Sequence, residues 1–117
     1  MRHQVKTKRL NRDEAHRNAM TRNMVTSVIL YERIKTTAPK AKYIQPIVDK
    51  LFSAVKGDNK LTVKRRLNSF LTDKNAIKKM LEELTTRYKD RKSGFTRITQ
   101  LGFRAGDAAP MVTLELV

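Results

Sequence analysis

The residues best suited to chemistry in this sequence are cations that no acid accompanies. The first twelve residues contain no Asp or Glu, and a run of like charges loses hydration on burial, so it stabilises no core of its own. Arg binds phosphate through a planar fork and Lys through a mobile point charge. Binding to a polyanion is therefore the chemistry that this segment favours. Its cations are Arg2, Lys6, Lys8, Arg9 and Arg12.

The excess of positive charge extends over the whole chain. The 26 Lys and Arg outnumber the 11 Asp and Glu, which gives a formal net charge of +15 on 117 residues. Charge of this size favours nucleic acid as a partner. An acidic membrane would also satisfy it, but no stretch approaches the ~18 apolar residues that span a bilayer, and no apolar signal-peptide segment follows the basic start. We expect a soluble, intracellular protein with no membrane partner.

Catalytic and metal-binding chemistry finds little support. The chain has no cysteine, and its two histidines, His3 and His16, lie among cations that disfavour a protonated imidazole. Asp13 and Glu14 are the nearest acids, but a helix N-terminus already explains them. Two widely spaced histidines make a poor zinc site, and the scattered glycines form no phosphate-binding loop. We expect no enzymatic activity, cofactor, metal or small-molecule substrate, and both rings are better suited to contacting nucleic acid.

A helix from about Arg12 to Tyr31 is the first element expected to position these cations. Asn11 and Glu14 resemble a capping box, and apolar residues recur at helical spacing from Met20 onward. The opposite face alternates small residues with long donors, which suits close approach to a phosphate-lined groove, although a solvated helix face would have the same composition. That face carries Arg12, Ala15, His16, Ala19, Arg22, Asn23 and Thr26.

A strand and three further helices are expected next. The β-branched segment 33–37 favours a short strand, and Thr37 can cap a second helix that ends before Gly57. Pro46 lies inside that helix, where proline removes a hydrogen bond at a cost of about 3 kcal/mol, so we expect a kink or a break. The apolar stripes of the three helices are Ile44, Ile47, Val48, Leu51 and Val55; Val63, Leu67, Phe70 and Leu71; and Ile77, Met80, Leu81, Leu84 and Tyr88.

Two strands joined by a hairpin loop close the sequence. Residues 95–104 are strand-like, but Ile98 has the opposite parity to its apolar neighbours, which indicates a twist or a bulge. Residues 111–116 alternate cleanly, and 105–110 have turn chemistry. The order helix, strand, three helices, two strands predicts a two-layer α+β domain, in which helices cover a small three-stranded sheet. We expect a basic arm at residues 1–10 and a single domain at residues 11–117.

Two basic regions therefore lie apart in the sequence, the arm with its helix and the segment 87–104. A helix-turn-helix in the second and third helices would instead predict a DNA-binding regulatory protein, a dimer on palindromic DNA. The scatter of cations over both ends of the chain favours folded RNA. The cluster Lys64-Arg65-Arg66 is interpreted first as a solvated helix face and second as an RNA contact.

Several blocks of the sequence resemble the bacterial-type large-subunit ribosomal protein L17 family. They span nearly the whole chain, and the Gly102–Asp107 block together with the N-terminal pattern is specific. The blocks are Met1–His3, Leu10–Arg12, His16-Arg17, Ala19-Met20, Arg22–Met24, Ile34–Thr37, Pro39–Lys42, Thr96–Ile98, Gly102–Asp107, Ala109–Met111 and Glu115-Leu116.

This resemblance implies a structural constituent of the cytoplasmic large ribosomal subunit that supports translation and has no enzymatic activity. It implies binding to the major large-subunit rRNA on the solvent side, near the nascent-chain exit region, and contacts with neighbouring ribosomal proteins. We expect the arm, the first helix and the C-terminal hairpin to neutralise converging rRNA phosphates. The residues predicted to bind RNA are Arg2, His3, Lys6, Lys8, Arg9, Arg12, His16, Arg17, Arg22, Lys35, Arg97 and Arg104.

Overall fold

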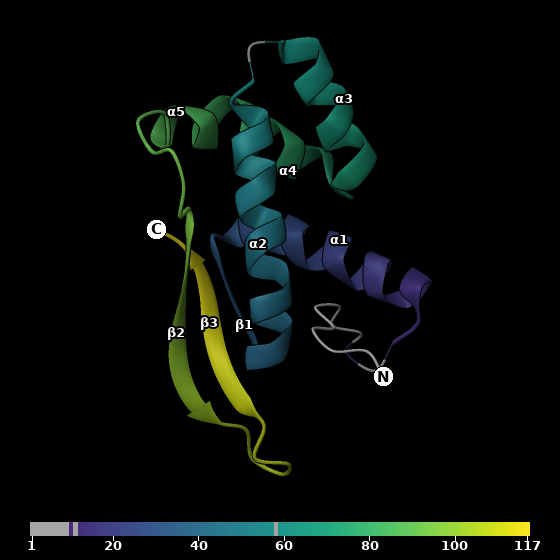
Figure 1. Cartoon of the computed structure of the whole chain (residues 1–117), viewed down its shortest axis with the longest axis vertical. Helices are drawn as coiled ribbons and strands as arrows, with labels where there is room; N and C mark the ends of the chain where they lie inside the picture. The colour runs from purple at the N-terminus through teal and green to yellow at the C-terminus, as the bar shows by residue number, and fades with distance from the viewer. Residues whose placement is uncertain (1–9, 11, 58) are drawn as a thin grey trace, which may run out of the picture.

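The computed structural model describes residues 10, 12–57 and 59–117 and confirms the predicted α+β class (Figure 1). A long helix and a short strand come first, three helical segments follow, and a two-stranded hairpin ends the chain. The third helical segment contains a π-helical stretch, η1. The elements are α1 (Glu14–Tyr31), β1 (Arg33–Thr37), α2 (Ala38–Val55), α3 (Lys60–Phe70), α4 (Lys74–Lys79), η1 (Met80–Leu84), α5 (Thr85–Arg87), β2 (Thr96–Phe103) and β3 (Pro110–Leu116).

The three strands form one antiparallel sheet in the order β1-β3-β2. The chain turns back directly from β1 into α2, which lies across the sheet, while α3 and α4 gather at the opposite end of the molecule from the hairpin loop (Figure 1). The β2–β3 hairpin extends past the N-terminal end of α2. The fold therefore separates a helical end from a projecting hairpin tip.

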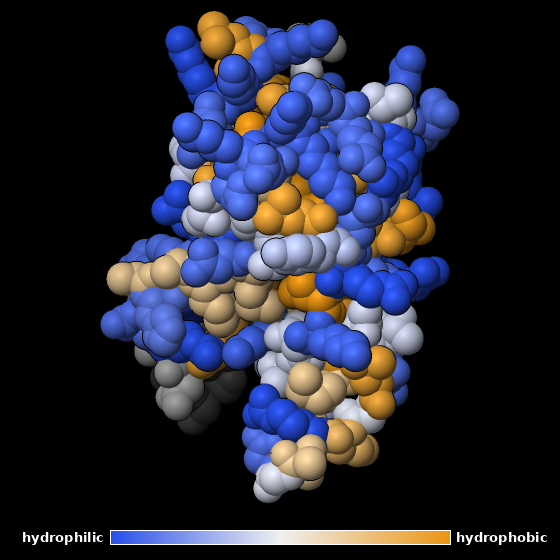
Figure 2. All heavy atoms as spheres, turned by 180° about the vertical axis from the view of Figure 1, so that it is seen from behind, coloured by the Kyte–Doolittle hydropathy of each residue, from blue (hydrophilic) through white to orange (hydrophobic). Residues whose placement is uncertain are grey.

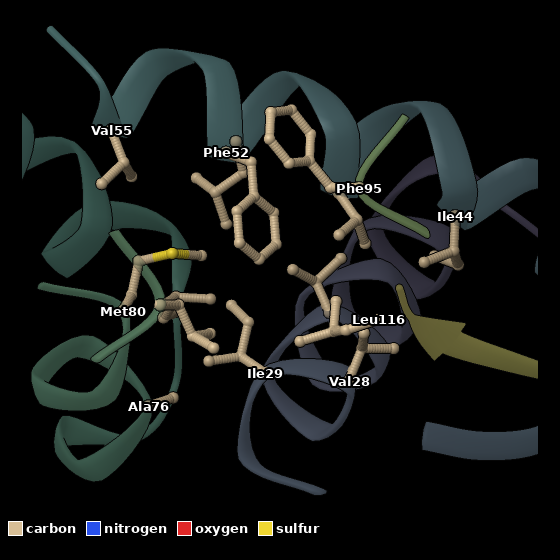
Figure 3. Close-up of a cluster of buried hydrophobic side chains, with 14 of the residues drawn as sticks. Val28, Ile29, Ile44, Phe52, Val55, Ala76, Met80, Phe95 and Leu116 are labelled. Carbon is tan, nitrogen blue, oxygen red and sulfur yellow. The ribbon is translucent and has the colours of Figure 1, made fainter. Parts of the chain in front are cut away.

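A single apolar core joins the sheet to the helices (Figure 3). Val28 and Ile29 of α1, and Leu116 of β3, are buried in it. Phe52 of α2 stacks on Phe95 with ring centroids 5.0 Å apart. Aromatic pairs of this kind add about 0.5–1.5 kcal/mol beyond their burial. The core thus fixes α1, α2 and the hairpin relative to one another.

The start of α1 differs from the expected capping box. The N-cap is Asp13, whose carboxylate accepts a hydrogen bond from the backbone N–H of His16 at 2.8 Å, and the helix begins at Glu14. The prediction that Asn11 and Glu14 form the box is therefore wrong. Asp13 fills the role because an ionised carboxylate at the N-cap both satisfies an orphan amide and complements the helix dipole.

Pro46 does not break α2, whose helical range runs uninterrupted from Ala38 to Val55. The missing N–H leaves the carbonyl of Lys42 without its usual partner. Both residues lie on the exposed side of the helix, where water can hydrogen-bond that carbonyl. Of the predicted kink or break, the break is wrong, because a proline on the exposed face costs the helix a hydrogen bond without burying an unpaired group.

The fourth predicted helix is confirmed in position but is irregular. It begins after the cap Asp73, whose side chain accepts from the backbone N–H of Asn75, and it becomes π-helical over η1. The hairpin agrees with the prediction made from the sequence. Its strand register shifts between Gln100 and Gly102, which confirms the predicted bulge. Gly102 has φ +118°, a conformation that a side chain would strain.

Candidate nucleic-acid interface

The start of α1 and the residue Arg12 just before it place donors at the surface. The guanidinium of Arg12 donates to the backbone oxygen of Leu10 at 3.1 Å, and that of Arg17 donates to the backbone oxygen of Arg12 at 3.2 Å. His16 is exposed, as are the two small residues of this face. A partner can therefore approach the helix backbone closely between the long side chains. The small residues are Ala15 and Ala19.

In the C-terminal half of the predicted face, Arg22 and Thr26 also make contacts within the protein. Arg22 donates through Nε to the backbone oxygen of Phe70 at 2.8 Å, where a cation complements the C-terminal end of α3. Thr26 is 5% exposed, and its hydroxyl oxygen accepts from the backbone N–H of Thr72 at 3.2 Å. The placement of Thr26 on an RNA-facing surface is wrong. The hydrophobic periodicity of α1 could not reveal this contact, because it depends on the turn between α3 and α4 packing on Thr26.

A hollow of about 340 Å³ brings α1 and β1 together. Lys35, a predicted site residue, lines it from β1, and Asn23 lines it from the predicted face of α1. The lining thus includes two lysines, one asparagine and two hydroxyl residues, whose side chains are of the kinds that donate to phosphate and ribose oxygens. Its full lining is Met20, Asn23, Met24, Ser27, Ile34, Lys35, Thr36 and Lys40.

Sequence reasoning missed Lys40 as a site residue. The available signal was its place in the first turn of α2, directly after the strand that carries Lys35. A strand that leads without a loop into a helix keeps the first turn of that helix beside the end of the strand. We name the surface formed by Asn23, Ser27, Lys35 and Lys40 the α1–β1 hollow.

The outer face of the sheet carries a second group of cations. The register places Arg33, Glu115 and Arg97 in one row across the three strands. Glu115 accepts from Arg33 at 2.9 Å and from Arg97 at 3.1 Å, and its side chain is only 12% exposed. The hydrogen bond from Arg97, with the charges of both guanidinium groups, lowers the pKa of Glu115 below its usual range.

This row keeps one net positive charge, and the two arginines remain exposed. Arg33 is 72% and Arg97 is 61% exposed, so both retain N–H groups that face solvent. Lys35 lies one row further along the same face, opposite Thr113. Arg33 was absent from the predicted site, although it lies two residues before Lys35 and therefore shares its face.

Arg104 is engaged within the hairpin loop. Its guanidinium donates to both carboxylate oxygens of Asp107, at 3.0 and 2.5 Å. Asp107 also accepts from the backbone N–H of Ala109 at 3.2 Å, and these bonds lower its pKa to about 2. The positive charge of Arg104 is therefore balanced inside the loop, which makes it a structural group of the turn as well as a predicted contact.

The remaining basic residues discussed from the sequence divide by position. The cluster Lys64-Arg65-Arg66 is exposed on α3, at the helical end of the molecule. The predicted arm residues lie outside the part of the chain that the structure describes. Within that part, no three His, Asp or Glu side chains come close enough together to hold a metal ion, and no helix combines the length and apolarity needed to cross a bilayer. The arm residues are Arg2, His3, Lys6, Lys8 and Arg9.

Blue, hydrophilic side chains cover much of the back of the molecule (Figure 2), and a cavity of about 460 Å³ lies at the helical end. Aliphatic side chains from α2, α3 and η1 line this cavity together with Lys60 and Lys64. None of the described residues that line it is an acid that could act as a general base. The cationic surfaces of α1, β1 and the outer sheet face remain the best candidates for binding.

Comparison with known proteins gives a consistent result along the chain. The family model described as "Ribosomal protein L17" matches residues 20–117. The large ribosomal subunit protein bL17 of Rickettsia bellii (strain OSU 85-389) is 46% identical over 117 residues, covering all of this chain and 82% of that relative. The bL17 protein of Hyphomonas neptunium is 48% identical over 118 residues, covering 83% of its length. That of Rickettsia typhi is 44% identical, covering 85% of its length.

Proposed function

This chain belongs to the ribosomal protein L17 family, and on that premise we propose how it binds in the large ribosomal subunit. As a family member it is a structural, non-enzymatic component of that subunit in the cytoplasm. It binds and stabilises folded large-subunit rRNA through the basic arm, α1 and the C-terminal hairpin, and it contacts neighbouring proteins of the subunit. By this contribution to the subunit it supports translation.

The convergence of α1 and β1 on the α1–β1 hollow carries this proposal. Lys35 and Lys40 meet the donor face of α1 there, although the sequence separates them from it. Folded RNA brings phosphates of distant segments together, and these phosphates repel one another. A concave surface with two ammonium groups neutralises that repulsion, and release of condensed counterions drives binding. The neighbouring amide and hydroxyl groups fix the orientation of the backbone.

The other predicted residues extend this surface on both sides. Arg12, His16 and Arg17 continue it along α1, and the arm cations precede them in the chain. Arg97, joined by Arg33, contacts phosphate from the outer face of the sheet. Arginine suits these exposed positions because a guanidinium that already bonds one carboxylate oxygen still has further N–H donors for a phosphate.

A salt titration of rRNA binding tests the α1–β1 hollow. The full chain is compared with the double variant Lys35→Ala/Lys40→Ala on large-subunit rRNA fragments, at several salt concentrations. Loss of two phosphate contacts should lower the slope of log K against log salt by about 1.4 to 1.8. Duplex DNA of equal length serves as a competitor, since a DNA-binding regulatory protein would prefer it.

A matched control removes the same charge at the helical end. Lys64→Ala/Arg66→Ala also deletes two exposed cations, but on α3. We expect its slope to stay close to that of the unmodified chain. Equal losses of slope in both double variants would show that net charge alone drives binding and would contradict the proposed site.

A further inference from the structure

The hairpin tip exposes an aromatic ring that the fold does not use. Phe103 is 78% exposed, the largest value among the exposed large apolar side chains of the described residues. It pairs with Pro110 at the last position of the β2–β3 ladder. The hairpin extends past the N-terminal end of α2 there (Figure 1). Burial of this aromatic side chain against a partner would stabilise the complex, because the ring is exposed to water in the isolated chain.

Hydrogen bonds hold the loop backbone next to this ring. The N–H of Arg104 donates to the oxygen of Ala109 at 2.8 Å, and the N–H of Ala108 donates to the oxygen of Arg104 at 3.0 Å. The two bonds from Arg104 to Asp107 close the loop from its side-chain side. A group held in place before binding loses little conformational entropy when a partner arrives. The backbone that carries Phe103 is therefore ordered before a partner binds.

The charge of the tip is unsuited to phosphate. Arg104 and Asp107 are its charged residues, and their charges cancel. With a pKa of about 2, Asp107 is ionised at neutral pH and repels a phosphate. The other exposed residues of the tip have small side chains or none, so a planar group such as a base can approach the ring. They are Ala105, Gly106, Ala108 and Pro110.

The register places the ring on the side of the sheet where α2 begins. Val112 is buried beneath the helices, and Pro110 lies two residues before it, so both point to the same face. Phe103 shares that face because it is paired with Pro110. The first turn of α2 carries Lys40, which lines the α1–β1 hollow. An RNA strand whose phosphates bind at the hollow can extend its bases toward the tip.

We propose that Phe103 stacks on an unpaired base of the bound RNA, with the Arg104–Asp107 pair holding the loop that presents the ring. This inference rests on the proposed rRNA binding. A surface of zero net charge around an exposed ring, on the side of the sheet where α2 and the lysine-lined hollow lie, matches the two parts of a nucleotide. The hollow takes the phosphate backbone and the tip takes the face of the base.

The chain contains no tryptophan, so the variant Phe103→Trp introduces a single indole at the proposed stacking position. Saturation with large-subunit rRNA should quench its fluorescence, and irradiation should cross-link it to a defined nucleotide. Leu61→Trp is the matched control, because Leu61 is 58% exposed on α3 at the other end of the molecule. It should show little quenching at the same RNA saturation.

Affinity measurements provide a second, independent readout. Phe103→Ala should weaken rRNA binding by about 5- to 150-fold, the range of one base–aromatic stack, while leaving the salt slope unchanged because no charge is lost. Phe103→Tyr should retain most of the affinity. The melting temperature should stay the same in both variants, since the ring makes no core contact.

The outcomes separate this inference from the proposed function. If the unmodified chain does not bind rRNA, the proposed function fails. If it binds with the expected salt slope but the indole of Phe103→Trp is not quenched, stacking alone is overturned. A cross-link in assembled large subunits to a protein instead of to rRNA would likewise overturn it and assign the ring to a protein pocket.

Discussion

Acidic side chains in this protein serve to place its cations. Glu115 joins arginines from two strands, and Asp107 holds Arg104 in the hairpin loop. Glu32 accepts from Lys79 at 3.1 Å and pairs with Arg87, and the hydrogen bond from Arg87 is the largest cause of its lowered pKa. In a chain with few acids, each such carboxylate orders more than one donor. Exposed cations thereby gain a fixed direction before any partner binds.

The pH dependence of the hairpin loop follows from Asp107. Its pKa is about 2 in the folded chain, below its ordinary value of 3.8, so the loop contacts are complete above about pH 4 and are lost as the pH falls through about 2. NMR titration should show the Asp107 carboxyl and the Ala109 amide shifting together near pH 2. Asp107→Asn should abolish that shift of the amide. A carboxyl that titrates near 3.8 would contradict the loop geometry.

At the scale of elements, the sequence predicted the features that depend on local residue patterns. It missed the features that depend on packing between distant segments. The predicted strand at 33–37 and the predicted bulge near Gly102 are both present in the structure. Both could be predicted because β-branched residues favour a strand, and an interruption in the alternation of apolar residues indicates a bulge. The π-helical stretch η1 and the contact of Thr26 with the α3–α4 turn depend on distant residues and left no local signal. Arg33 was missed although the parity of β1 placed it beside Lys35.

Within the candidate site, the sequence identified cations but not their neighbours. Lys35 and Arg97 were predicted, and both are exposed on the sheet. Periodicity cannot show that Lys40 shares a hollow with α1, because that depends on how the two helices pack. The pairing of Arg104 with Asp107 was available from the sequence, since the two lie three residues apart in a tight turn.

Pro46 gives a test at the scale of one element. A proline in a helix interior costs about 3 kcal/mol relative to alanine, and this one lies on the exposed face of α2. Pro46→Ala should therefore raise the free energy of unfolding by roughly 1 to 3 kcal/mol, measured by urea denaturation. Pro39→Ala is the control, because Pro39 lies in the first turn, where proline costs little. Equal effects of the two substitutions would contradict this account.

At the scale of the whole molecule, a net charge of +15 opposes folding and promotes binding. Repulsion among the cations destabilises the compact chain, and added salt screens it over a Debye length that falls from about 30 Å at 0.01 M to about 3 Å at 1 M. The same screening weakens attachment to rRNA. Stability of the isolated chain and affinity for RNA should therefore respond to salt in opposite directions.

This opposition can be measured on one preparation. The melting temperature of the isolated chain should rise as salt increases, while its affinity for rRNA falls steeply over the same range. A short polyphosphate, at matched ionic strength, should raise the melting temperature further than chloride does, because it binds the folded cationic surface and not only screens it. The variant Lys35→Ala/Lys40→Ala should reduce this additional gain, since it removes both ammonium groups of the α1–β1 hollow. A melting temperature that falls with salt would show that ion pairs, such as those of Glu32 and Glu115, outweigh repulsion in this fold.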